Sequence, residues 1–151
     1  MCPADVAAAP GTIFGGCHCG NLRYTLAWPL PEAPTLRVCG CDYCTRHGAA
    51  WTSHPDAVLS LSVLTPGELI AYRFGSATAD FLACGRCGIL TLAACAFSDG
   101  ERAVVNANTF DSLDATTCPR IATDFDAEAN DTAARLARRR RNWSPLARAP
   151  R

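Results

Sequence analysis

Short stretches in which apolar and polar residues alternate dominate the first two-thirds of the chain. Residues 22–26, Leu-Arg-Tyr-Thr-Leu, alternate until a Trp-Pro pair ends the pattern, and residues 59–63, Leu-Ser-Leu-Ser-Val, alternate in the same way. Strict alternation places one set of side chains on each face of an extended strand. The pattern therefore predicts two strands that are buried on one face only.

Two further features predict strands through their flanking turns. Residues 69–74 follow a Pro-Gly turn signal. Residues 89–97 form a continuous apolar run that ends at a Ser-Asp-Gly turn, and residues 103–106 follow that turn. The last two segments are expected to pair as a hairpin. Short strands separated by frequent turns predict a mostly-β fold.

The end of the chain has the pattern of a helix. From about residue 130, Asn-Asp-Thr offers N-cap side chains, and a helix is expected to end before the Ser-Pro pair at residues 144–145. Acidic residues near its start and the arginine run at residues 138–141 suit the helix dipole. Residues 1–11 have the character of a flexible lead-in. Residues 12–151 are therefore expected to form a single domain with a helical tail.

Composition narrows the class of protein. The 151 residues are 49% hydrophobic and 19% charged, which is typical of a globular chain, and the formal net charge is zero. A neutral chain has no overall attraction for nucleic acid, so the arginine run is interpreted as a solvated helix face. No segment approaches the roughly 18 apolar residues of a membrane span, and the first ten residues lack a signal-peptide pattern. We expect a cytoplasmic protein with no membrane partner and no nucleic acid.

Ten cysteines require an explanation, and disulfides and metal ligation are the two that compete. Thiols stay reduced in the cytoplasm, where clustered cysteines more often hold metal. Most of the cysteines fall into three tight groups. These are the C-x-C of Cys17 and Cys19, the C-x-C-x-x-C of Cys39, Cys41 and Cys44, and the C-x-x-C of Cys84 and Cys87.

The grouping predicts two zinc sites. A structural zinc site has four protein ligands, and a catalytic one typically has three and an open position. Two pairs and a triplet divide most simply as four plus three, with one structural and one catalytic Zn²⁺ per chain. The closed site would then comprise Cys17, Cys19, Cys84 and Cys87, and the open site Cys39, Cys41 and Cys44. A division that joins the first two cysteines of the triplet to the last pair is also compatible with the spacing.

The segments around these cysteines carry a family pattern. Residues 16–24 read Gly-Cys-His-Cys-Gly-Asn-Leu-Arg-Tyr, the triplet follows, and residues 81–88 read Phe-x-x-Cys-x-x-Cys-Gly. An Asn-x-Asn segment lies within residues 103–111. In this order the motifs resemble the glutathione-dependent formaldehyde-activating enzyme family, which includes the centromere protein V group. The resemblance covers residues 15–111.

The resemblance implies a β-tent fold of small antiparallel sheets around a structural zinc, and the same division of ligands. It also implies a carbon–sulfur lyase reaction, the formation of S-hydroxymethylglutathione from formaldehyde and glutathione. The partners would be a small-molecule thiol such as glutathione and a small aldehyde. The open zinc would deprotonate the thiol, since the thiolate is the nucleophile. The alternative is a non-enzymatic zinc module for protein or nucleic-acid partners, which has no need of an open cluster.

Other residues are candidates for supporting roles. His47 can complete the open zinc site or line a turn, and His54 is a weaker candidate fourth ligand. Cys95 is predicted to be a buried thiol, and Cys2 and Cys118 unpaired surface or loop cysteines. Four arginines are candidates for meeting the carboxylates of a glutathione-like substrate, with surface solvation as their default: Arg23, Arg46, Arg73 and Arg86.

Overall fold

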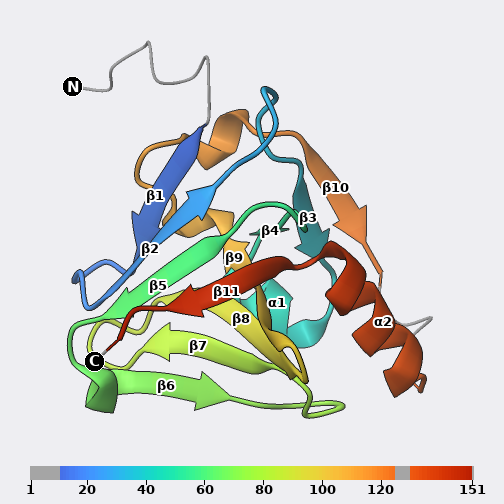
Figure 1. The fold of residues 1–151 in the computed structure, drawn as a ribbon. Helices are drawn as coiled ribbons and strands as arrows, with labels where there is room; N and C mark the ends of the chain where they lie inside the picture. Colours follow the sequence, from blue (N-terminus) through green and yellow to red (C-terminus); the bar gives the residue numbers. More distant parts are fainter. Residues whose placement is uncertain (1–10, 125–129, 151) are drawn as a thin grey trace.

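The fold is mostly β with a short C-terminal helix, as the sequence predicts (Figure 1). The computed structural model describes residues 11–124 and 130–150, so the predicted lead-in falls, apart from Gly11, outside the described residues. The strands in chain order are β1 (Thr12–Gly16), β2 (Leu22–Ala27), β3 (Leu36–Cys39), β4 (Trp51–Thr52), β5 (Leu59–Val63), β6 (Leu69–Tyr72), β7 (Asp80–Cys84), β8 (Leu90–Phe97), β9 (Gly100–Asn106), β10 (Arg120–Thr123) and β11 (Ser144–Arg148). The helices are α1 (Asp42–His47) and α2 (Thr132–Asn142), with 3-10 turns η2 (Pro66–Glu68), η3 (Ala107–Thr109) and η4 (Ala115–Thr117).

Burial explains why the predicted strands form where they do. Leu22, Tyr24 and Leu26 of β2 are buried while the residues between them face outward, and β5 repeats this pattern. The apolar run of β8 is buried over its first six residues, as expected for a strand covered on both faces. The predicted hairpin of β8 and β9 is confirmed by six antiparallel residue pairs.

Strand β9 is the line along which the sheet divides. On one edge it pairs with β8, which continues to β7 and then β6. On the other edge the start of β9 pairs with β11 and its end with β4. The β11 branch continues through β5 and β2 to β1, and the β4 branch through β3 to β10. The β5–β11 and β3–β10 pairs are parallel and the other strand pairs are antiparallel.

The C-terminal helix is confirmed, but the chain continues into a strand that the sequence pattern did not predict. Asp131 caps α2 by accepting a hydrogen bond from the Ala134 N–H at 2.9 Å. After α2 the chain enters β11 and lies between β5 and β9 (Figure 1). Pro145 is tolerated because it lies near the strand's start, before pairing with β5 begins at Leu146. The tail is therefore part of the sheet.

The three cysteine groups pack in two separate parts of the hydrophobic core. Cys17 and Cys84 are buried together with Leu22. Cys44 belongs to a separate cluster that includes Trp51 and Trp143. At least one cysteine of each group is thus packed in the core. None of the helices in the described residues is long and apolar enough to cross a membrane.

Candidate metal centres

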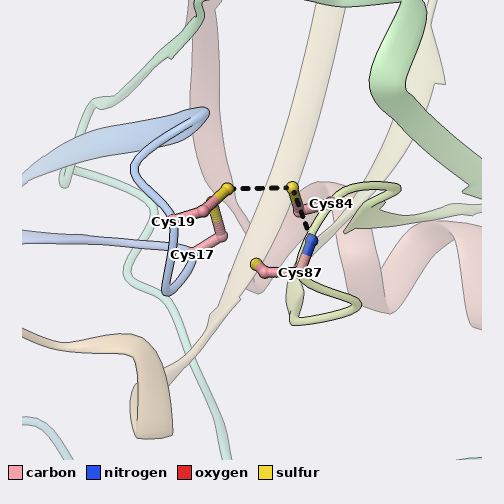
Figure 2. Close-up of side chains that lie close together, drawn as sticks. All are labelled: Cys17, Cys19, Cys84 and Cys87. Atoms are coloured by element: carbon pink, nitrogen blue, oxygen red, sulfur yellow. Dashed lines mark hydrogen bonds between the residues drawn. The ribbon is translucent and has the colours of Figure 1, made fainter.

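Four cysteines from two distant turns meet at one point (Figure 2). Cys17 and Cys19 lie in the turn between β1 and β2, and Cys84 and Cys87 at the turn between β7 and β8. Their sulfur atoms all lie within 4.8 Å of one another. The Cys17 Sγ–Cys19 Sγ distance is 3.7 Å and the Cys19 Sγ–Cys84 Sγ distance is 3.5 Å. The closed group of the four-plus-three division is thus assembled in space.

These distances fit a tetrahedral zinc ion. A Zn–S bond of about 2.3 Å places the sulfurs of an ideal tetrahedron roughly 3.8 Å apart. The two measured sulfur–sulfur distances lie within a few tenths of an ångström of that value. Four thiols without a competing oxygen ligand favour zinc over hard cations such as magnesium or calcium. The group can therefore bind zinc as a closed site.

The backbone of the two turns helps to orient the four sulfurs. Gly88 has a φ of +79°, in the left-handed region that favours glycine, and it closes the turn after β7. The Cys87 N–H donates to Cys84 Sγ at 3.5 Å, and the Leu22 N–H donates to Cys17 Sγ at 3.2 Å. Backbone N–H donors of this kind stabilise a thiolate. The turns therefore orient the sulfurs toward a common centre.

The second group lies at the end of β3 and the start of α1. Cys39 ends the strand, Cys41 is the N-cap of the helix, and Cys44 is in its first turns. Their three sulfur atoms also lie within 4.8 Å of one another. The Trp51 indole N–H donates to Cys44 Sγ at 3.3 Å, and the Cys44 N–H donates to Cys41 Sγ at 3.4 Å. The three sulfurs of the triplet thus form a group of their own, and the sulfurs of Cys84 and Cys87 are not part of it.

The Asn-x-Asn segment at the end of β9 supports the loop that follows this triplet. Asn106 is buried, accepts a hydrogen bond from the Ala50 N–H at 3.3 Å and donates one to the Leu90 carbonyl at 3.0 Å. Asn108 donates to the carbonyl of Gly48, the residue that ends α1, at 2.7 Å. Asn106 therefore connects the segment after α1 to the start of β8, and Asn108 holds the end of α1 near the end of β9.

The buried amide is expected to matter for stability. Asn106→Ala leaves the Ala50 N–H and the Leu90 carbonyl buried without these partners, so we expect a loss of about 1–3 kcal/mol in the free energy of unfolding. Denaturant unfolding of the zinc-loaded protein measures it. Asn108→Ala is the matched control, because Asn108 is exposed and its loss should stay below about 1 kcal/mol. Equal losses in the two variants would contradict this account.

The triplet has no fourth ligand among the described residues. Neither a histidine nor a carboxylate of this part of the chain joins the three sulfurs. His47 packs on the Tyr43 ring with 4.8 Å between centroids, and His54 Nδ1 accepts a hydrogen bond from the Asp56 N–H at 3.1 Å. The structure therefore does not bring either candidate histidine to the sulfurs. Three ligands and an open position are the donor set of a catalytic zinc.

Within the triplet, Cys39 and Cys44 affect each other's ionisation. A hydrogen bond from the Cys44 thiol lowers the pKa of Cys39 to about 6. The same hydrogen bond, together with burial, raises the pKa of Cys44 far above its usual range. Adjacent thiolates repel each other, so all three ionise together only around a cation. The donor set accordingly suits a divalent ion.

A cavity of about 490 Å³ opens beside the triplet. Its volume is in the usual range for small-molecule sites. Its lining includes Cys39, Cys41 and Cys44 of the triplet. The other lining residues include four aromatic ones, Trp51, Phe74, Phe81 and Trp143. They also include four arginines, Arg37, Arg135, Arg138 and Arg139.

The arginines at the cavity are not the ones expected from the sequence. The four candidates are exposed and form ion pairs with acids on the surface, at 2.6–3.2 Å: Arg23 with Asp111, Arg46 with Asp42, Arg73 with Asp80 and Arg86 with Glu68. None of them lines the cavity. Surface solvation, their default, is the correct interpretation. The cavity arginines come from β3 and α2. These two elements are far apart in the sequence, so only the folded chain shows that they lie at the same cavity.

The interpretation of residues 138–141 as a solvated helix face is wrong for Arg139. This side chain is only 9% exposed, because α2 packs it against the sheet. It donates to Thr78 Oγ1 at 2.7 Å, and its guanidinium carbon lies 4.9 Å from the centre of the Trp143 ring. Burial lowers the pKa of Arg139, and the charges of Arg138 and Arg135 lower it further, although nearby Cys95 opposes the shift. Part of the run therefore faces inward.

Two of the cysteines outside the two groups, Cys95 and Cys118, lie in the core. Cys95 is buried, as predicted, and burial raises the pKa of its thiol. Cys118 follows η4 in a loop, as predicted, but it is buried and not at the surface. Its thiol donates weakly to the Asp114 carbonyl at 3.9 Å. Cys2 lies outside the described residues.

Comparison with known proteins agrees with the cysteine pattern. Residues 12–125 match the model of the family described as glutathione-dependent formaldehyde-activating enzyme, which confirms the resemblance seen in the sequence. A crystal structure of a protein from Rhodobacter sphaeroides is 28% identical, with a TM-score of 0.50, over 72% of this chain and 99% of that one. No curated protein matches the sequence. Helix α2 and β11 lie beyond the matched residues.

Proposed function

Because the chain belongs to the glutathione-dependent formaldehyde-activating enzyme family, we propose that it is a zinc-dependent carbon–sulfur lyase acting on adducts of a small thiol and a small aldehyde. The observation that carries the proposal is that Cys39, Cys41 and Cys44 line a cavity of about 490 Å³. A zinc ion that only supports folding needs no access to a cavity of substrate size. The alternative of a pure binding module leaves this open donor set unexplained.

The two groups would hold two ions with different roles. The group of Cys17, Cys19, Cys84 and Cys87 supplies four sulfurs and joins the early and late turns of the sheet, which suits a structural zinc. The triplet supplies three sulfurs at a cavity wall, which suits a catalytic zinc. Zinc bound there would offer its fourth position to a substrate thiol and lower the pKa of that thiol.

The surrounding residues have roles that follow from their positions. The Trp51 N–H bonded to Cys44 Sγ reduces the negative charge on that sulfur and fixes its orientation. The aromatic residues that line the cavity, Trp51, Phe74, Phe81 and Trp143, would limit the access of water to the reacting groups. In the reaction the substrate thiolate attacks the aldehyde carbon, a C–S bond forms, the C=O π bond breaks and the oxygen takes up a proton. The reverse steps release the aldehyde.

The proposal is tested with protein in which cobalt replaces zinc. Glutathione should change the ligand-field and thiolate charge-transfer bands, because its thiolate enters as a fourth ligand. The change should weaken as pH falls, since protons compete for both ligand and substrate thiolates. In parallel, exchange NMR on formaldehyde and glutathione should show faster adduct formation with zinc-loaded protein than in buffer alone.

The spontaneous reaction sets the background for this test. A matched amount of zinc-loaded albumin controls for nonspecific thiol and zinc chemistry. If glutathione and other small thiols leave the cobalt bands unchanged, the lyase function is refuted, and the alternative of a non-enzymatic zinc module takes its place. A spectral response without acceleration would mean that the chain binds thiols but does not catalyse this reaction.

A further inference from the structure

A series of aromatic rings in mutual contact begins at the triplet and belongs to the lining of the cavity. The Trp51 indole N–H donates to Cys44 Sγ at 3.3 Å, so this ring adjoins one of the three sulfurs. The Trp51 and Phe81 ring centroids are 6.0 Å apart at an interplanar angle of 74°, and the Phe81 and Phe74 centroids are 4.9 Å apart. All three aromatic residues line the cavity. A substrate whose sulfur reaches the triplet would therefore have apolar surface close to its reacting atoms.

Two tyrosines hold these rings in position. Tyr43 of α1 packs edge-on against Phe81 with 4.9 Å between centroids, and its ring lies 4.7 Å from that of Phe74. Tyr72 of β6 stacks on Tyr43 at 5.5 Å and on Phe74 at 5.7 Å. Neither tyrosine is among the described residues that line the cavity. A ligand would thus meet rings that are already fixed by packing, which lowers the entropic cost of binding.

Small residues help to account for the volume of the cavity. Gly75, Ala79 and Ala93 line it together with the aromatic residues, and both alanines are buried. Cavities in the range of about 300–1,000 Å³ hold drug-sized ligands. The volume of about 490 Å³ is far larger than formaldehyde, which has no carbon substituent, can fill. The cavity therefore has room for a substituent of several carbon atoms.

The charged residues at the cavity already interact within the protein. Arg37 donates to Ser53 Oγ at 2.7 Å, and Arg139 donates to Thr78 Oγ1 at 2.7 Å. The other charged residues of the lining also have interaction partners: Asp124, Arg135 and Arg138. An aromatic ring, in contrast, gains when a ligand removes its apolar surface from water. The aromatic part of the lining is therefore the part that a ligand has most reason to cover.

We propose that the adduct bound at the triplet carries an apolar group, an aromatic ring or a chain of several carbon atoms, which packs on Trp51, Phe81 and Phe74. The inference rests on the proposed function, because it assumes that the sulfur of the adduct reaches the triplet. Formaldehyde combined with a polar thiol would leave the rings uncovered. The apolar group belongs to the thiol half or to the aldehyde half, since both extend from the carbon–sulfur bond that forms beside the sulfurs.

Two thiols that differ in one group test the thiol half. 2-Phenylethanethiol and 2-mercaptoethanol share the CH₂–CH₂–SH unit, but the first carries a phenyl ring where the second carries a hydroxyl. In titrations of the cobalt-loaded protein, 2-phenylethanethiol should give its half-maximal spectral change at a concentration roughly tenfold lower or less, because its ring is removed from water.

The aldehyde half is tested by rate, with glutathione kept as the thiol. Phenylacetaldehyde is acetaldehyde with a phenyl ring in place of one hydrogen. Exchange NMR with zinc-loaded protein should show an acceleration over buffer that is about tenfold greater for phenylacetaldehyde. A preference in the thiol titration assigns the apolar group to the thiol, and a preference in the rates assigns it to the aldehyde. If neither series shows a preference for the phenyl compound, the inference is refuted.

Substitutions at the end of the ring series locate the preference. Phe74→Ala should reduce the preference for the phenyl compound at least about threefold, and Phe74→Leu, which keeps an apolar side chain, should recover part of it. Phe14→Ala is the matched control, because Phe14 is an exposed ring on β1 that does not line this cavity. A preference that is the same in Phe74→Ala and in the unaltered protein would contradict the inference.

2-Phenylethanol separates this inference from the proposed function. It keeps the phenyl ring but has a hydroxyl in place of the thiol, so ligand-observed NMR titration of the zinc-loaded protein reports the rings without a thiolate. It should bind more weakly to Phe74→Ala than to the unaltered protein or Phe14→Ala. If it does so while no thiol changes the cobalt bands, the lyase function is refuted and the apolar site stands. Thiols that change the cobalt bands without any preference for the phenyl compounds would refute only the apolar site.

Discussion

Cys17→Ser is expected to leave the chain unfolded or insoluble at room temperature. Cys17 is 2% exposed, and its sulfur lies with those of Cys19, Cys84 and Cys87 within 4.8 Å. Replacing it removes one of the four sulfurs proposed to bind the structural zinc and places a hydroxyl where the proposed site needs a thiolate. Circular dichroism and the zinc content of the soluble fraction measure the effect.

The size of the effect follows from the energetics of structural zinc. Zinc binding to small four-ligand sites is worth about 10–16 kcal/mol near neutral pH, and this free energy contributes to folding. A domain of this size is stable by only about 5–15 kcal/mol in total. The four sulfurs come from the β1–β2 and β7–β8 turns, which the sheet otherwise joins only through intervening strands. Losing the ion therefore removes a large share of the stability at the point where the two turns meet.

Cys118→Ser is the control for the substitution itself. Cys118 is also buried, but it lies in neither group, and a serine hydroxyl there can still donate to the Asp114 carbonyl. Its variant should fold and lose about 1–2 kcal/mol at most. If Cys17→Ser is no more destabilised than Cys118→Ser, the group around Cys17 is not a structural zinc site.

Much of the fold follows from local pattern. The strands whose alternation is strict, β2 and β5, and the hairpin of β8 and β9 lie where the sequence places them, because one buried face is enough to specify a strand. Strand β11 escaped prediction, since its proline argues against a strand and its partners β5 and β9 are distant in the chain. Helix α1 was also missed, because its N-cap is the thiol of Cys41, which is not a usual capping residue.

The candidate site shows a similar division. Spacing alone grouped the cysteines, because two sulfurs within a few residues can reach one ion only through a tight turn. Which arginines face the cavity was beyond local pattern. Arg37 and Arg138 are about a hundred residues apart, and their meeting depends on the course of the chain through β10 and α2. A periodicity check on residues 135–139 would have signalled one cationic helix face, but not what it faces.

Cys41→Ser is expected to remove the second zinc and the thiol response while leaving the chain folded. The unaltered protein should bind two zinc ions per chain and the variant one, since the closed group does not include Cys41. Helix α1 should survive, because serine is a good N-cap residue and its hydroxyl can accept the Cys44 N–H that now bonds to Cys41 Sγ. The melting temperature should therefore change by only a few degrees.

With the triplet broken, no site remains to hold the substrate thiolate. Glutathione should leave the cobalt spectrum of Cys41→Ser unchanged, and adduct formation should fall to the spontaneous rate, whereas Cys118→Ser should behave like the unaltered protein. If Cys41→Ser unfolds the chain while Cys17→Ser destabilises it only slightly, the roles of the two zinc sites are reversed. If Cys41→Ser binds one zinc ion per chain and keeps full activity, the triplet has no role in the reaction.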